Sequence, residues 1–169
     1  MVVVQSGFGG SVHSLVLLRK KEVQDELKLD GGQKAKLEKI AGTQRPIADP
    51  TERRKKFAEL GKAAERILSA AQLKRFKEIS LQADEVSSIT DSVVAKALGI
   101  TSDQLEKLRT VQSKFGERLR ALSTGERVRR FEDMQTEAMS QAMTVLTPSQ
   151  REKYKEMRGA PFKFNTCRK

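Results

Sequence analysis

The sequence predicts an all-α fold made of two similar helical repeats. Three observations lead to this prediction: apolar residues recur at spacings of three and four, capping sequences precede these runs, and the second half of the chain repeats the pattern of the first. No segment shows the sustained alternation of apolar and polar residues that is typical of a half-buried strand. Because only 37% of the 169 residues are hydrophobic and 33% are charged, we expect an open helical body with a small core.

Four segments are expected along the chain: a flexible N-terminal tail at 1–13, a first helical repeat at 14–83, a second helical repeat at 84–160 and a C-terminal tail at 161–169. In each repeat a short helix, at about 14–27 or 91–98, precedes three further helices. Residues 84–90 are expected to link the two halves, and Pro161 is expected to follow the last helix.

The repeat is visible as three blocks that keep their order. Residues 23–40 align with 94–111, residues 54–60 with 128–134, and residues 67–79 with 145–157. The last two offsets differ by four residues, about one helical turn, so the facing of the helices is roughly preserved.

Six predicted helices begin with a capping sequence, in which a short polar side chain accepts a hydrogen bond from the first turn and a Glu or Gln three residues later reaches back. Each cap contributes about 1 kcal/mol to helix stability. At Ser69 nothing around the cap breaks a helix, so a continuous helix with a bend is the alternative there. The six pairs are Asp30 and Gln33, Asp49 and Glu52, Ser69 and Gln72, Thr101 and Gln104, Ser123 and Glu126, and Thr147 and Gln150.

The charge is strongly positive and evenly spread. The formal net charge is +11 and the halves 1–90 and 91–169 carry +5 and +6, which predicts a positive surface field and acidic partners. His13 and Cys167 are the only residues of their kinds, too few for a disulfide framework or a zinc site built by one chain. No apolar run approaches about 20 residues, so no membrane span is expected.

No catalytic arrangement is recognisable. The single His lies in the N-terminal tail, and the glycines at 7–10 lack the Gly-Lys-Ser/Thr that follows in a phosphate-binding loop. We therefore expect a protein that is not an enzyme and that needs no cofactor.

The segment 146–150 has the sequence L-T-P-S-Q and resembles the L-T-x-x-Q motif of the Spy/CpxP family of periplasmic helical chaperone-like proteins. In that family the motif occurs twice per chain, whereas this chain has four versions, of which only the last matches fully. The resemblance implies that each half corresponds to one protomer, and that one chain forms an open, cradle-like pseudo-dimer. The motif positions are Leu29, Asp30 and Gln33; Leu68, Ser69 and Gln72; Ile100, Thr101 and Gln104; and Leu146, Thr147 and Gln150.

The resemblance implies ATP-independent chaperone activity in the periplasm or another exported location, with unfolded or acidic client proteins held on a basic, apolar-dotted concave surface. No signal peptide is recognisable, so the location follows from the resemblance alone. An envelope-stress sensor module is one alternative. A nucleic-acid or polyanion binder is another, which the pI of about 10 favours, although aromatic residues for base stacking are few.

The densest basic clusters lie at matched positions of the two repeats, beside a Phe in each case. They give the hypothetical client-binding set, to which one Met of the second repeat is added because Met side chains adapt to many shapes. The simpler interpretation is a solvated helix face beside a core Phe and a core Met. The set is Arg54, Lys55, Lys56 and Phe57 with Arg129, Arg130, Phe131 and Met134.

Overall fold

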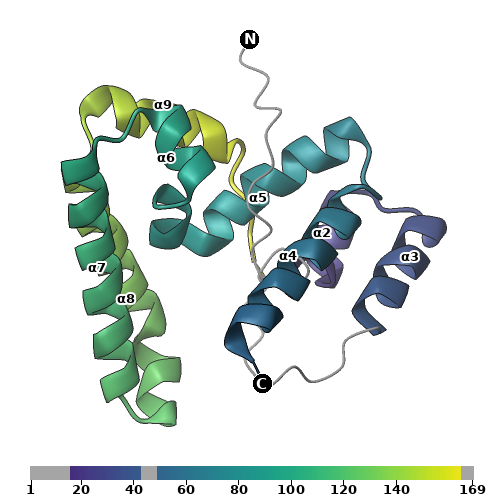
Figure 1. Ribbon diagram of the computed structural model, residues 1–169, viewed down its shortest axis with the longest axis horizontal. Helices are drawn as coiled ribbons and strands as arrows, with labels where there is room; N and C mark the ends of the chain where they lie inside the picture. The colour runs from purple at the N-terminus through teal and green to yellow at the C-terminus, as the bar shows by residue number, and fades with distance from the viewer. Residues whose placement is uncertain (1–15, 43–48, 165–169) are drawn as a thin grey trace. The chain divides into compact units, whose positions relative to one another are not determined.

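The computed structural model describes residues 16–42 and 49–164, and this part of the chain is helical without any strand (Figure 1). The all-α prediction is confirmed. The expected N-terminal tail, His13 and Cys167 lie outside the described residues. The helices are α2 (Lys21–Glu26), α3 (Gly31–Gly42), α4 (Pro50–Glu65), α5 (Ala70–Ile89), α6 (Ser92–Leu98), α7 (Ser102–Ala121), α8 (Thr124–Val145) and α9 (Pro148–Arg158).

The chain divides into two compact units. The first comprises Met1–Gln82 and Arg158–Lys169, and the second comprises Ala83–Met157. Residues 84–90, expected to link the two halves, follow this division directly and form the last turns of α5 up to Ile89. The segment contains neither Gly nor Pro, and burial of Val86 and Ile89 favours continued helix.

The helices begin where the capping sequences lie. Five of the six starts have both bonds of the capping box: the short side chain accepts the N3 backbone N–H, and the N3 side chain accepts the N–H of the cap residue. At the sixth start, the Asp49 carboxylate accepts the backbone N–H groups of Thr51 and Glu52. The chain does not continue as a bent helix at Ser69, since α4 ends at Glu65 and α5 begins at Ala70.

Each unit has a small set of fully buried side chains, as expected from the composition. In the second unit Tyr154 is 1% exposed, and its hydroxyl forms a 2.7 Å hydrogen bond with Ser88 Oγ. A buried hydroxyl needs such a partner. The largest buried side chains are Leu18, Val23, Leu37, Phe76, Ile79 and Leu81 in the first unit and Ile89, Val94, Leu108 and Tyr154 in the second.

Candidate functional site

In the second unit the two glutamines of the L-T-x-x-Q motifs bond to each other. Gln104 Nε2 donates to Gln150 Oε1 at 2.9 Å, and Gln150 Nε2 donates back to Gln104 Oε1 at 3.1 Å. Each Oε1 also accepts the N–H of its own cap residue, Thr101 or Thr147. We call this reciprocal pair a glutamine clasp; it joins the N-termini of α7 and α9.

The first unit contains the same clasp at equivalent positions. Gln33 Nε2 donates to Gln72 Oε1 at 2.8 Å, and Gln72 Nε2 donates back at 3.2 Å. The remaining bonds also correspond, because Gln33 reaches the carbonyl of Ile67 as Gln104 reaches that of Val145. The motif glutamines are thus fully used in holding helix starts together, which identifies them as structural residues.

The turn before each clasp also corresponds between the units. Lys28 has a φ of 51°, and Gly99, which is 71 residues further on, has a φ of 67°. Gln150 Nε2 donates to the Gly99 carbonyl, while Gln72 Nε2 donates to those of Leu27 and Lys28. The first unit therefore places a lysine in the left-handed conformation that glycine adopts without steric cost.

The helices α7 and α8 form an antiparallel hairpin whose burial falls toward its turn (Figure 1). Leu108 and Ala142, far from the turn, are fully buried, whereas Phe115 and Phe131 are half-buried and Val128 is 48% exposed. The two Phe rings meet edge to face with centroids 6.0 Å apart. Two helices alone cannot cover each other's apolar stripes, so the turn end keeps partly exposed apolar side chains.

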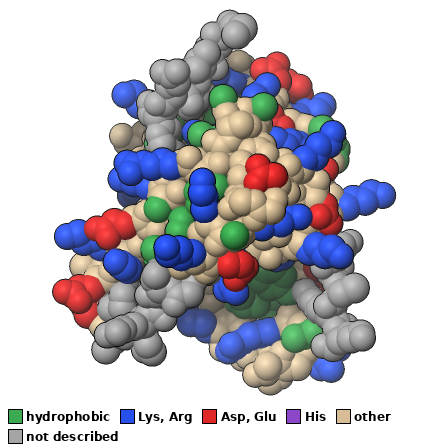
Figure 2. Space-filling model, turned by 90° about the vertical axis from the view of Figure 1, so that its right-hand side faces the viewer, with side chains coloured by type: hydrophobic (Ala, Val, Ile, Leu, Met, Phe, Trp, Pro, Cys, Tyr) green, Lys and Arg blue, Asp and Glu red, His purple; other side chains and the backbone are tan. Residues whose placement is uncertain are grey.

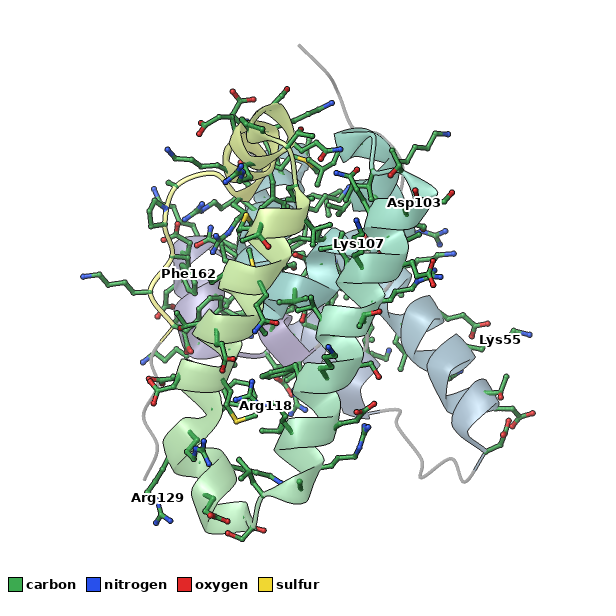
Figure 3. All side chains as sticks on the ribbon, turned by 90° about the vertical axis from the view of Figure 1, so that its left-hand side faces the viewer. Lys55, Asp103, Lys107, Arg118, Arg129 and Phe162 are labelled. Atoms are coloured by element: carbon green, nitrogen blue, oxygen red, sulfur yellow. The ribbon has the colours of Figure 1, made fainter. Side chains whose placement is uncertain are left out.

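The same end of the hairpin is rich in arginine. Residues 115–131, which we call the hairpin end, contain five arginines and two glutamates, a net charge of +3. Arg118 pairs with Glu137 across the hairpin at 2.9 Å, and Arg129 projects outward from α8 close to the turn (Figure 3). Arg127 donates to the backbone carbonyls of Arg120 and Leu122, which satisfies carbonyls at the C-terminal end of α7.

One carboxylate at the hairpin end has a pKa that its surroundings lower. Hydrogen bonds from Ser123 lower the pKa of Glu126, and the nearby positive charges of Arg129 and Arg130 lower it further. The hydrogen bonds of the α8 cap therefore favour the charged form of the Glu126 carboxylate. The arginines around it outnumber this negative charge.

The eight predicted client-binding residues do not share the same exposure to solvent. Lys55, Lys56, Arg129 and Arg130 are exposed, and Phe131 is half-buried. Met134 is only 4% exposed, so it packs inside the hairpin and is unavailable to a client; this assignment is corrected, because Met134 shares the buried stripe of α8 with Ala138 and Ala142. The side chains of Arg54 and Phe57 lie outside the described residues.

Sequence reasoning missed Arg118 and Arg120 at the hairpin end. Their signal was the presence of five arginines between 118 and 130, on both sides of the helix start predicted at Ser123. On the face seen in Figure 2, Lys and Arg side chains are spread over the surface.

The described residues offer no group of three or more His, Cys, Asp or Glu that could hold a metal ion. Among them, no helix is long and apolar enough to cross a bilayer. No protein-family model, curated protein or solved structure matches this chain.

Proposed function

We propose that the chain is an ATP-independent, chaperone-like protein of the Spy/CpxP kind that binds unfolded clients in the periplasm or another exported compartment. The observation that carries the proposal is the hairpin end, where half-buried Phe115 and Phe131 and exposed Val128 lie among five arginines. A holdase needs this combination, because charge accelerates capture and partly exposed apolar side chains bind many sequences without tight packing.

The glutamine clasps support the proposed relationship to the family. Each unit contains two versions of the L-T-x-x-Q motif, and the glutamines of each pair bond to one another. This is the result expected if each half corresponds to one protomer and the whole chain to a fused, cradle-like pair.

Binding through the hairpin end should depend on charge. We would replace Arg129 and Arg130 by glutamate and compare the variant with a matched charge reversal at Arg151 and Lys153, which are exposed on α9. The assay is aggregation of a chemically denatured acidic client without ATP. About tenfold more of the hairpin variant should be needed for the same suppression, while the α9 variant should resemble the unchanged protein. Equal effects of the two reversals would contradict a role for the hairpin end.

The five arginines also favour a second candidate, a polyanion binder. Duplex DNA titrated over a salt series tests it, because phosphate neutralisation makes log affinity fall steeply with log salt. Salt-sensitive DNA binding without any suppression of client aggregation would replace the chaperone proposal by this one.

A further inference from the structure

The chain that follows α9 lies along the first unit. Residues 159–164, which we call the strap, have no regular secondary structure, and Phe162 is seen on this segment in Figure 3. Exposure alternates along it, because Pro161 and Lys163 are exposed whereas Phe162 and Phe164 are half-buried. This alternation is typical of an extended segment with one face against protein.

The strap begins at a glycine where a side chain would be strained. Gly159 has a φ of 61°, and a Cβ added there would overlap the carboxylate of Glu78. That carboxylate is held in place by an ion pair with Arg75 at 3.0 Å. The sharp turn out of α9 and onto α5 thus depends on the absence of a side chain.

One buried side chain of α5 forms hydrogen bonds with the backbone of the strap. Gln82 is 9% exposed, and its Nε2 donates to the carbonyls of Arg158 at 2.7 Å and Ala160 at 3.0 Å. Its Oε1 accepts the N–H of Phe162 at 2.8 Å. Without the strap the Gln82 amide would lose its bonds with Ala160 and Phe162, which is costly.

Other side chains complete the contact. Arg75, which bridges Glu26 and Glu78, donates a further hydrogen bond to the Ala160 carbonyl at 2.9 Å. The rings of Phe162 and Phe164 meet edge to face at 4.8 Å, and the Lys20 ammonium lies 5.6 Å from the centroid of the Phe164 ring. The surface therefore binds backbone groups of the strap and contacts the ring of Phe164 through Lys20, while the two Phe rings of the strap pack on each other.

We infer that this surface of the first unit is a binding site for extended peptide segments with two aromatic residues at alternate positions, and that the strap is its tethered occupant. Backbone groups supply most of the polar contacts, so a foreign segment can make the same bonds. The preference for such a segment comes from the aromatic pair and from the Lys20 contact.

Tethering sets how strongly the strap competes. A short link gives an effective concentration on the order of millimolar, so a free peptide meets a site that is mostly occupied. A strap that is bound nine-tenths of the time lowers the apparent affinity of a free peptide about tenfold. Releasing the strap should recover that factor.

The test uses the full chain and a fluorescein-labelled peptide with the sequence of residues 158–164, followed by fluorescence anisotropy. In the strap variant Phe162 and Phe164 are replaced by alanine, and circular dichroism verifies its fold. We expect the strap variant to bind the probe about tenfold more tightly than the unchanged chain. Adding Gln82→Ala should weaken binding about tenfold, whereas adding Gln112→Ala, at a glutamine of the second unit, should change it less than twofold.

A measurement on the unchanged chain needs no variant. Amide hydrogen exchange at Phe162 should accelerate when the probe is added at saturation, because the probe takes the Gln82 Oε1 acceptor. The inference is overturned if the strap variant binds no more tightly than the unchanged chain, or if a probe with both Phe replaced by Ala binds equally well. Unchanged Phe162 exchange at saturating probe would overturn it too.

The inference rests on the proposed function in one respect only: the natural ligand of the site would be a segment of an unfolded client. The two can fail separately, because peptide binding is measured without any aggregating client. A chain that binds the probe but does not suppress aggregation keeps the site and loses the chaperone proposal.

Discussion

Replacing Gln150 by alanine removes one half of the clasp in the second unit. Four hydrogen bonds are lost: those with Gln104 Nε2 and Oε1, that from the N–H of Thr147, and that to the carbonyl of Gly99. The two bonds with Gln104 are partly buried and contribute about 1 kcal/mol each, while the two exposed bonds contribute about 0.5 kcal/mol each. The better helix propensity of alanine returns a few tenths, so the second unit should lose about 2–3 kcal/mol.

The chain carries its own reporter for this experiment. Tyr154 is the only Tyr, the chain has no Trp, and this side chain is buried in the second unit. Its fluorescence therefore follows unfolding of that unit in urea. With a slope of about 1–3 kcal/mol per molar urea, the midpoint should fall by about 1–2 M.

A control variant and a double-mutant cycle make the test specific for the clasp. Gln141→Ala on α8 removes an exposed bond to Glu137 and should shift the free energy of unfolding by less than about 0.5 kcal/mol. After Gln104→Ala, the further loss from Gln150→Ala should be smaller by about 1–2 kcal/mol, because the shared bonds are already gone. A Gln150→Ala effect equal to that of the control, or strict additivity with Gln104→Ala, would refute the clasp as a stabilising element.

Three further predictions concern local strain and charge. Lys28→Gly should stabilise the first unit by about 1 kcal/mol, because it relieves a positive φ. Gly99→Ala should destabilise the second unit. A loss of stability in Lys28→Gly, measured by urea titration, would contradict this prediction. Burial raises the pKa of Glu65 above 4.5, so the stability that the protonated carboxyl contributes is lost as the pH rises through that raised pKa. Glu65→Gln should therefore raise the stability of the protein at neutral pH. A lower melting temperature of this variant would argue against the reasoning. The pKa of Glu126 is lowered by hydrogen bonds from Ser123, so its contribution is present above about pH 4.5 and lost as pH falls through the lowered value. Ser123→Ala should return the pKa toward its ordinary value, which NMR titration measures; an unchanged pKa would contradict the assignment.

The helix starts could be predicted because a cap is a local interaction. The side chain of Thr101 or Thr147 needs only the N–H groups of the next three residues, and all of them are visible in the sequence. The helical conformation of 84–90 could not be predicted in the same way. Whether a polar-looking segment continues a helix depends on partners far along the chain, such as the bond between Ser88 and Tyr154.

The candidate site could be predicted only in part. The basic character of Arg129 and Arg130 is a property of composition and neighbourhood, and both side chains are exposed. For Met134 the sequence left both a client-binding and a core position open, because periodicity shows which residues share a face but not whether another helix covers that face. Its burial depends on how α7 packs against α8.

The sequence by itself determined the helices, their caps and the even spread of positive charge, because these follow from neighbouring residues and from composition. Only the tertiary structure decided that the motif glutamines pair across 39 and 46 residues, and that Gln82 of α5 bonds to the backbone of the strap across 78 and 80 residues. A side-chain amide has two donors and an acceptor, and local capping uses only the acceptor. Where the remaining groups go is settled when distant segments meet, and in this protein those meetings create both the clasps and the peptide-binding surface that we infer.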